Sequence, residues 1–500
     1  MAVAAAVQAR REDSAADPGV ARPSADPVEI VTTPLLSARR APEWLRQPLD
    51  DRLLTDEVRA VLASAEAPDT TCLSVHRDDT VILAADDDLL LVPASAMKLV
   101  TAAALLEVAP PDDRYRTEAV IRADAPIADG VLDGDLWLVG GGDPVLSTPD
   151  YIERYDEPRV HTDLTELADA VANELASRGI VEITGGVVGD ESKYTPAERD
   201  YTGEVDGDGN PIWKAEFRTQ NQAGPLSALL VNDGYTAWPD EPNRRQNSRA
   251  SDPALAAARL FDDLLEERGL VIRGSSRNEV APAVSERISL GVVESPTIGE
   301  IIGRMLRHSD NTTAEMLLKE IGVRSGVGAQ RGLAVFAVAQ ALDRAGYPVQ
   351  GRTLDGETTT IQIADGSGLS SLNRITCRLV EEILRRSGPD SVIADGLAVV
   401  GESGTLARCL VDDPSARGDV EAKTGTLNDV TALAGLTVAD NGDVVTFAMI
   451  ANGEGVGARL GSCNELQTTL IRGVANHPYG PDVDALSPEP PATVVVTPAP

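Results

Sequence analysis

Hydrophobic residues over 72–108 show two patterns, first an alternation with polar residues and then a continuous run. Apolar and polar residues alternate over 72–76 and 80–85, and a polar turn at 77–79 separates the two runs. This pattern predicts a β-hairpin. Residues 96–108 are instead a continuous Ala- and Leu-rich run, which predicts a buried helix that begins near Ser95.

Helix-capping signals accompany two further apolar patterns. Thr55 precedes apolar residues at helical spacing over 58–62, and is predicted to cap a helix there. Residues 164–175 show the same spacing, with Thr162 as the predicted N-cap and Gly179 just past the end. The chain therefore mixes helices and strands from its first part onward.

The rest of the chain divides by character. From about residue 110 to about 290, strands and helices alternate with long polar loops, and 195–222 is predicted to be one such loop. Beyond that region the predicted helices lie near 297–307, 311–321, 329–345, 375–387 and 457–475. The predicted strands lie near 419–424, 430–438 and 443–451, and the last two join across a turn at 440–442.

Charge and cysteine content exclude several classes of protein. The formal net charge of −35 argues against nucleic-acid binding, which needs a basic surface. The four cysteines have no close spacing, and the four histidines form no His-Glu-x-x-His pattern, so zinc sites are not predicted. The cysteines fit either one disulfide or buried free thiols.

The sequence predicts neither a transmembrane helix nor an ordinary signal peptide. No run of some 18 apolar residues is present, so no transmembrane helix is predicted. Residues 1–7 are apolar but short, and Arg10 and Arg11 follow them rather than precede them. Either an export signal lies upstream of this start, or the protein stays inside the cell.

Lysine is rare in this chain, and two of the lysines lie in sequence motifs that could carry chemistry. Only five of the 44 basic residues are lysines. Lys98 follows Ser95 by three residues, so the two side chains share a helix face. Because a buried lysine loses its proton more readily than an exposed one, the pair can supply a nucleophile with its own base. Lys423 begins the strand sequence Lys-Thr-Gly-Thr.

A third motif, Ser309-Asp310-Asn311, lies between two predicted helices. Ser-x-x-Lys, Ser-Asp-Asn and Lys-Thr-Gly in this order are typical of class A β-lactamases and penicillin-binding proteins. In this hypothesis Ser95 attacks a carbonyl, Lys98 takes its proton, Ser309 passes a proton to the leaving amine, and Asn311 holds Lys98 or the substrate.

The remaining candidate residues are expected to bind the substrate. Lys423 supplies a fixed positive charge and Thr424 a hydroxyl for a substrate carboxylate. Gly425 lets the substrate backbone lie close to the strand. The backbone N–H groups of Ser95 and Thr426 are expected to form the oxyanion hole. No metal or cofactor is needed for this chemistry.

About 210 residues separate Ser95 from Ser309, more than a compact β-lactamase contains between these motifs. Further stretches, at 136–144, 224–229, 365–370 and 404–406, accompany the trio. Together they resemble the D-alanyl-D-alanine carboxypeptidase/endopeptidase family, the class C low-molecular-mass penicillin-binding proteins of the type-4 kind.

The resemblance implies an α+β multidomain fold. It implies a β-lactamase/transpeptidase-like catalytic domain, with a five-stranded antiparallel sheet flanked by helices and large insertions between the first two motifs. The expected division is a disordered lead-in (1–30), a catalytic domain in two parts (31–109 and 291–477), an inserted α/β region of one or more domains (110–290) and a disordered Pro-rich tail (478–500).

The resemblance also implies a function. The expected reaction is serine-type D-Ala-D-Ala carboxypeptidase activity, with or without endopeptidase activity, on peptidoglycan stem peptides. β-Lactam antibiotics would be covalent inhibitors, and the cell envelope or periplasm would be the location. The alternatives are a β-lactamase or esterase of the same fold, and an inactive scaffold that binds peptidoglycan.

Overall fold

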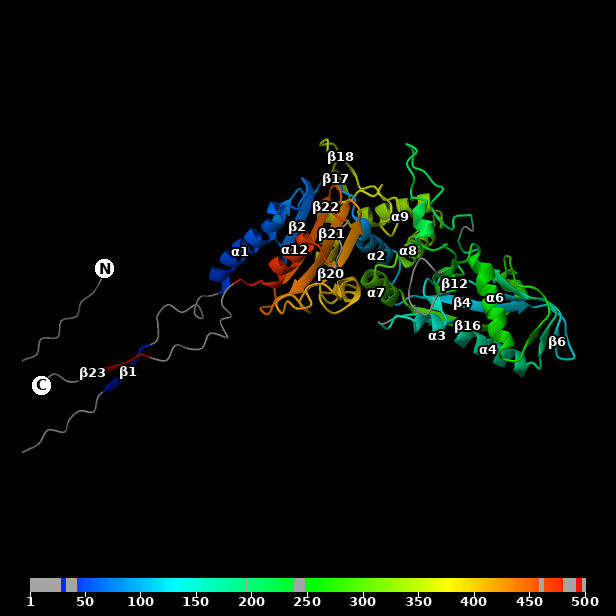
Figure 1. The fold of residues 1–500 in the computed structure, drawn as a ribbon. Helices are drawn as coiled ribbons and strands as arrows, with labels where there is room; N and C mark the ends of the chain where they lie inside the picture. Colours follow the sequence, from blue (N-terminus) through cyan, green and yellow to red (C-terminus); the bar gives the residue numbers. More distant parts are fainter. Residues whose placement is uncertain are drawn as a thin grey trace, which may run out of the picture. The chain divides into compact units, whose positions relative to one another are not determined.

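The computed structural model describes most of the chain. The described residues are 28–32, 43–155, 157–194, 197–237, 248–457, 463–479 and 492–496. They fall into two units, of which 49–479 is the larger (Figure 1). In the smaller unit, β1 (Val28–Thr32) pairs antiparallel with β23 (Ala492–Val496). Residues 28–30 of the predicted lead-in and 492–496 of the predicted tail thus lie in these strands, and most other residues of both segments lie outside the described ones.

The larger unit contains a six-stranded antiparallel sheet in the order β19-β20-β21-β22-β2-β3. The strands are β2 (Thr70–Arg77), β3 (Thr80–Ala85), β19 (Ala398–Val399), β20 (Glu421–Leu427), β21 (Val430–Val438) and β22 (Val444–Asn452). Five of them form the sheet that was expected, and β19 adds a sixth, two-residue strand at its edge. The hairpin of β2 and β3 is confirmed.

Helices cover both faces of this sheet (Figure 1). Side chains of successive strand residues point to opposite faces. Thus Ala432 and Ala434 of β21 pack with one group of helices, whereas Leu433 packs with the other. The first group is α2 (Met97–Leu106), α7 (Ile298–His308), α8 (Asn311–Arg324), α9 (Arg331–Arg344), α10 (Cys377–Ser387) and α11 (Val392–Asp395). The second is α1 (Glu43–Ala63) and α12 (Glu465–Ala475).

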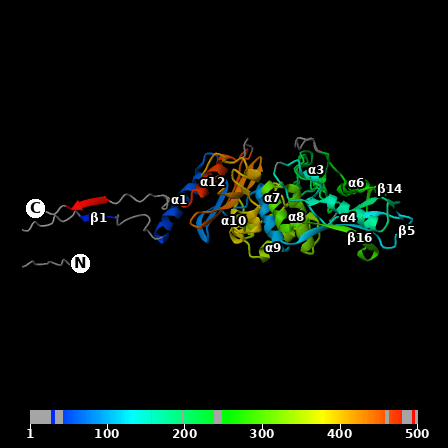
Figure 2. The ribbon, with the colours of Figure 1, turned by 90° about the horizontal axis from the view of Figure 1, so that it is seen from below.

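A second set of sheets lies between α2 and α7 in the sequence (Figure 2). The order β15-β11-β7-β4-β16 makes a five-stranded sheet, and β14-β10-β6-β5 makes a four-stranded one. Their main strands are β4 (Arg114–Arg122), β7 (Leu136–Val139), β11 (Val187–Asp190) and β16 (Arg287–Thr297). Helices α4 (Leu164–Ser177) and α6 (Pro253–Glu266) bury their apolar faces against these strands in a separate core.

The shorter elements of this region complete the two sheets or connect their strands. The strands are β5 (Ile127–Ala128), β6 (Val131–Leu132), β8 (Leu146–Ser147), β9 (Thr162–Asp163), β10 (Glu182–Ile183), β12 (Tyr235–Ala237), β13 (Ser248–Arg249), β14 (Val271–Ile272) and β15 (Arg277–Asn278). A short hairpin of β17 (Gln350–Arg352) and β18 (Thr358–Thr360) follows α9.

Three local predictions are wrong. Thr55 lies inside α1, because the helix begins twelve residues before it, at Glu43. Its hydroxyl donates to the carbonyl of Asp51 at 2.6 Å. Asp163, not Thr162, caps α4 by accepting a hydrogen bond from a backbone N–H, since the Thr162 hydroxyl donates to Asp143 instead. The predicted loop over 195–222 contains a short helix, α5 (Glu216–Thr219).

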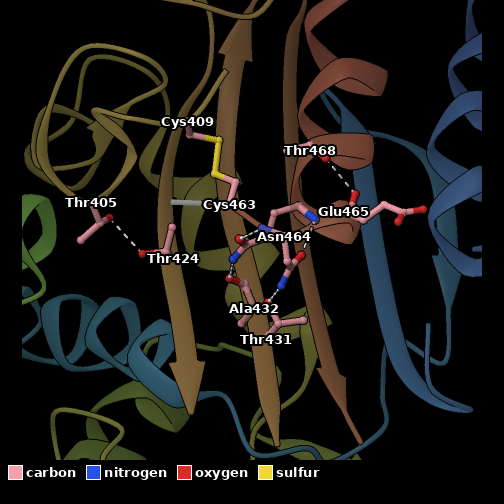
Figure 3. The surroundings of a disulfide bond; sticks show 10 residues. Thr405, Cys409, Thr424, Thr431, Ala432, Cys463, Asn464, Glu465 and Thr468 are labelled. Atoms are coloured by element: carbon pink, nitrogen blue, oxygen red, sulfur yellow. Dashed lines mark hydrogen bonds between the residues drawn. A yellow bond between two sulfur atoms is a disulfide. The ribbon is translucent and has the colours of Figure 1, made fainter. Parts of the chain in front are cut away.

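All four cysteines form disulfides. Cys72 of β2 pairs with Cys377, the first residue of α10, across 305 residues of sequence. Cys409 pairs with Cys463 and ties the loop before β20 to the segment before α12 (Figure 3). Of the alternatives that the sequence left open, free thiols are excluded and two bridges form instead of one.

The described residues contain neither a cluster of metal-binding side chains nor a membrane-spanning helix. No three His, Cys, Asp or Glu side chains gather there in a way that could hold a metal ion. None of the described helices combines the length and the apolar character needed to cross a membrane.

Candidate active site

Ser95 lies in a tight turn at the entrance to α2. The turn is a 3-10 helix, Ala94–Ala96, and it leads directly into α2. Ala94 has φ +47°, in the left-handed region. Its carbonyl lies so close to Gly368 that a Cβ there would be 1.8 Å away, and Gly368 itself has φ +84°. Only glycine fits that position, so Gly368 allows its loop to pack directly against the turn that holds Ser95.

Lys98 lies one turn after the serine and is fully buried. Its Nζ is 3.1 Å from Ser95 Oγ, 2.7 Å from Asn311 Oδ1 and 2.6 Å from the carbonyl oxygen of Ser367. A neutral amine has two N–H donors and one lone pair. Donation to Asn311 and Ser367 therefore leaves the lone pair for the hydroxyl proton of Ser95.

Burial also changes the acidity of this amine. Desolvation lowers the pKa of Lys98 to about 8, although the negative charges of Asp365, Glu315 and Asp310 oppose the change. A lysine with this pKa is deprotonated to a useful extent near neutral pH. Lys98 therefore has the geometry and the acidity of a general base for Ser95.

Ser309, Asp310 and Asn311 form the junction between α7 and α8. Ser309 ends α7 in the left-handed conformation, with φ +55°. Asp310 caps α8 by accepting a hydrogen bond from the backbone N–H of Thr313 at 2.9 Å. Asn311 then reaches Lys98 with its oxygen, while its Nδ2 donates to the carbonyl of Gln222 at 2.7 Å. The cap at Asp310 thus fixes the positions of Ser309 and Asn311, the residues on either side of it.

Lys423 lies behind Ser309 rather than in the open cleft. It is fully buried on β20, and its Nζ donates to Ser309 Oγ at 2.9 Å and to the carbonyl of Thr424 at 2.7 Å. Burial, and then the charge of Lys98, hold the pKa of Lys423 well below its usual value of 10.5. The Thr424 hydroxyl donates to the hydroxyl of Thr405 at 2.9 Å (Figure 3).

Gly425 of β20 lies against the turn that holds Ser95. A Cβ at this position would lie 2.7 Å from the carbonyl oxygen of Pro93 and 3.1 Å from the nitrogen of Ala96. These atoms belong to the turn that holds Ser95. The glycine therefore lets β20 approach the serine turn.

A cleft of about 820 Å³ opens over these residues. Its lining includes Ser95, Ser309, Asn311, Thr405 and Thr426. The structure thus gathers all three motifs at one cleft, with the two buried lysines beneath its floor.

One buried acid, Glu315, supports the site and escaped the sequence analysis. Glu315, fully buried on α8, accepts hydrogen bonds from the backbone N–H groups of Gly366 at 3.1 Å and Ser367 at 2.8 Å. It thereby fixes the peptide whose carbonyl binds Lys98. Burial, and then the charge of Asp365, raise the pKa of Glu315 to about 8. Its position four residues after Asn311, on the same helix face, was the available signal.

Comparisons with known proteins agree with this geometry. Residues 70–244 and 237–468 match the D-Ala-D-Ala carboxypeptidase 3 (S13) family. A D-alanyl-D-alanine carboxypeptidase of Actinomadura sp. (strain R39) is 28% identical over 412 residues, which cover 70% of this chain and 71% of that protein. Carboxypeptidase DacB of Mycolicibacterium smegmatis is 27% identical over 253 residues, which cover 49% of this chain and 51% of that protein, or about half of its length.

The fold also matches a solved structure. Penicillin binding protein 4 (dacB) from Haemophilus influenzae superposes with a TM-score of 0.64 at 19% identity, covering 84% of this chain and 98% of that chain. That likeness shows that this chain has the same transpeptidase-like fold. The match to the family spans most of the chain, including all three motifs, so the chain belongs to the D-Ala-D-Ala carboxypeptidase 3 (S13) family of serine peptidases.

Proposed function

We propose that Ser95 is the nucleophile of this D-Ala-D-Ala carboxypeptidase and that Lys98 is its base. The observation that carries the proposal is the buried amine of Lys98, 3.1 Å from Ser95 Oγ with two further acceptors in place. Lys98 takes the hydroxyl proton as Ser95 Oγ bonds to the carbonyl carbon of the penultimate D-alanine. The backbone N–H groups of Ser95 and Thr426 receive the negative charge on the carbonyl oxygen.

The tetrahedral intermediate then breaks its carbon–nitrogen bond. Ser309 gives a proton to the leaving nitrogen, and Lys423 behind it replaces that proton. D-Alanine departs, and the rest of the peptide stays on Ser95 as an ester. Water adds to the ester, Ser95 Oγ leaves and regains its proton from Lys98, and the proton of the water returns to the pair of Ser309 and Lys423.

Recognition of the terminal carboxylate falls to groups at the surface of the cleft. Lys423 is buried behind Ser309, so we assign the direct contacts to the hydroxyls of Ser309 and Thr426. Thr424 donates to Thr405 and supports the same wall. The charge of Lys423 acts through the hydroxyl of Ser309 instead of through a direct ion pair.

The substrate class and the location are part of the same proposal. Stem peptides of peptidoglycan end in D-Ala-D-Ala, and β-lactams would acylate Ser95 as analogues of that end. The Haemophilus influenzae protein has been crystallised in complex with a β-lactam. Two disulfides favour an oxidising compartment such as the cell envelope.

We also propose that residues 110–290 form an inserted region distinct from the catalytic domain of 31–109 and 291–477. The separate apolar core of the intervening sheets supports this division. Strand β16 continues beyond residue 290 to Thr297, so the second boundary is placed more naturally at the end of that strand.

The test uses labelled penicillin and a pentapeptide that ends in D-Ala-D-Ala. The wild type is expected to carry one covalent penicillin, located by mass spectrometry on Ser95, and to release D-alanine from the peptide. The variant Ser95→Ala is expected to do neither. An adduct on another residue would refute the assignment of the nucleophile, and rapid turnover of a chromogenic β-lactam would favour the β-lactamase alternative.

A further inference from the structure

A second, smaller pocket opens beside the junction of α7 and α8. It has a volume of about 240 Å³. Gln222, His308, Ser309 and Asn311 line both this pocket and the main cleft, so the two are neighbours along the same wall. The proposed mechanism assigns no role to the small pocket itself.

The lining of the small pocket also includes arginines that lie over tyrosine rings. The guanidinium carbon of Arg159 is 3.5 Å from the ring centre of Tyr155, and that of Arg249 is 4.3 Å from the ring centre of Tyr235. Arg249 also donates to the Tyr235 hydroxyl at 3.0 Å. Stacking of this kind holds a guanidinium group in place while its edge stays available for hydrogen bonds.

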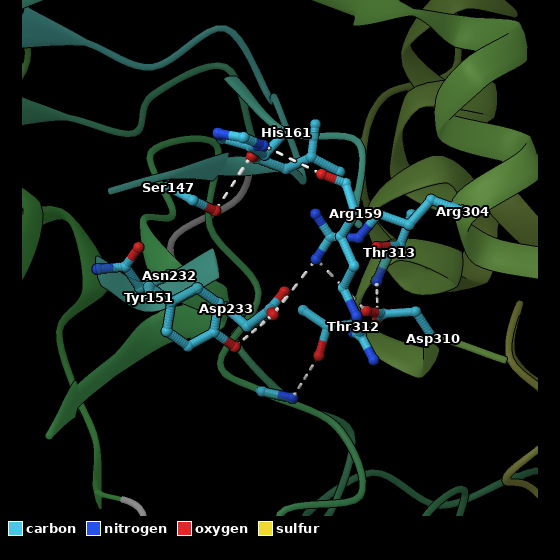
Figure 4. A network of polar contacts seen from close by, with 12 residues as sticks. Ser147, Tyr151, Arg159, His161, Asn232, Asp233, Arg304, Asp310, Thr312 and Thr313 are labelled. Carbon is cyan, nitrogen blue, oxygen red and sulfur yellow. Dashed lines mark hydrogen bonds and ion pairs between the residues drawn. The ribbon is translucent and has the colours of Figure 1, made fainter. Parts of the chain in front are cut away.

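The acids of the pocket have cationic partners already. Asp233 accepts a hydrogen bond from the Tyr151 hydroxyl at 2.7 Å and pairs with Arg304 at 3.5 Å. Asp310 lies 3.8 Å from the same guanidinium group (Figure 4). Arg304 is itself buried. Two carboxylates and one buried arginine therefore form a closed network.

Arg159 and Arg249 stand outside that network. Among the described residues, neither makes an ion pair with a carboxylate, and Nε of each and Nη1 of Arg249 are buried without an acceptor. A buried donor without an acceptor is costly. The two guanidinium groups therefore leave the pocket with unmatched positive charge and unmatched donors.

The neighbouring titratable groups respond to this charge. Burial, and then the charges of Arg159 and Arg304, lower the pKa of His308 to about 4. Burial alone would raise the pKa of Asp310, yet Arg304, the backbone N–H of Thr313, Arg159 and Arg249 hold it below its ordinary value. The positive field thus reaches the Ser309 side of the main cleft.

We propose that this pocket is a subsite for a carboxylate carried by the peptide substrate upstream of the scissile bond, bound by Arg159 and Arg249. The inference rests on the proposed peptidase function and adds a preference for acidic peptides. A guanidinium group matches the planar geometry of a carboxylate with two parallel hydrogen bonds. The pocket volume accommodates such a group together with its adjoining carbon atoms.

The test compares peptides that end in D-Ala-D-Ala and carry one glutamate at the first, second or third position before that D-Ala-D-Ala end. Each has a counterpart with glutamine in its place. For at least one position, the wild type is expected to favour the glutamate peptide by about tenfold in kcat/KM, since charge-assisted hydrogen bonds differ from neutral ones by that order. Release of D-alanine from the glutamine peptides tests the peptidase function separately.

The variants Arg159→Gln and Arg249→Gln are each expected to reduce this preference to about twofold or less. The matched control is Arg273→Gln, an equal loss of charge at an exposed ion pair with Glu182. It is expected to retain the preference. Because the readout is a ratio on one enzyme sample, partial unfolding of a variant does not change it.

Three results would overturn the inference. The wild type could treat glutamate and glutamine alike at all three positions. Both variants could keep the full preference, which would place the carboxylate elsewhere. Inorganic phosphate could raise the melting temperature of the wild type and not of the variants while the peptides are not distinguished, which would show a site for free anions outside the substrate path.

Discussion

The acidity of Lys98 determines how fast Ser95 can be acylated at each pH. Acylation requires the neutral amine, and the pKa of Lys98 is about 8. The neutral fraction is then about one-tenth at pH 7 and about nine-tenths at pH 9. The acylation rate is therefore expected to rise about tenfold over this interval and to level off above it.

An ordinary lysine would behave differently. With the usual value of 10.5, the neutral fraction rises about a hundredfold between pH 7 and pH 9 and has no plateau in that interval. The difference between the two profiles comes from burial, since the nearby carboxylates act in the opposite direction. A plateau near pH 9 is thus the signature of the desolvated amine.

Stopped-flow measurement of acylation by a fluorescent penicillin, from pH 6 to pH 10, checks this prediction. Melting temperatures at each pH show that the protein stays folded. The control is Lys98→Arg, which keeps its proton throughout and is expected to acylate at least about a hundredfold more slowly. A flat profile for the wild type, or an undiminished rate for Lys98→Arg, would refute the assignment of the base.

Three further predictions concern the support of the site. Glu315→Gln places an amide nitrogen against the backbone N–H of Gly366 or Ser367, so one of these donors loses its acceptor. The variant is expected to have a lower melting temperature, measured by calorimetry, and slower acylation, measured by penicillin labelling. Gly368→Ala forces a Cβ into the carbonyl of Ala94 and is expected to cost at least about 1–3 kcal/mol in the free energy of unfolding, measured by denaturant titration; an unchanged value would contradict the close approach. Replacing Cys72 and Cys377 by alanine is expected to cost about 2–5 kcal/mol in the same titration, because a long loop is no longer closed.

Much of the local structure could be predicted from periodicity and capping. The hairpin of β2 and β3 follows from alternation around a polar turn, and α2 follows from the Ala- and Leu-rich run after Ser95. Ser95 and Lys98, the proposed nucleophile and base, could be predicted because their spacing of three already places them on one helix face. These features depend on residues close together in the chain.

Other features depend on contacts between distant segments. Asp163 rather than Thr162 caps α4, because the Thr162 hydroxyl donates to Asp143, 19 residues earlier in the chain. The partners of Cys72 and Cys409 lie 305 and 54 residues away. No local pattern specifies such pairs.

By itself the sequence indicated the residues to which we assign the chemistry, since Ser95, Lys98, Ser309 and Lys423 stand in recognisable motifs. Only the tertiary structure decided what these residues can do. Lys98 becomes a base because packing removes water from its amine, and Glu315 matters because it holds a loop 51 residues away. Desolvation and contact between remote segments are properties of the packed chain, so neither can be read from a stretch of sequence.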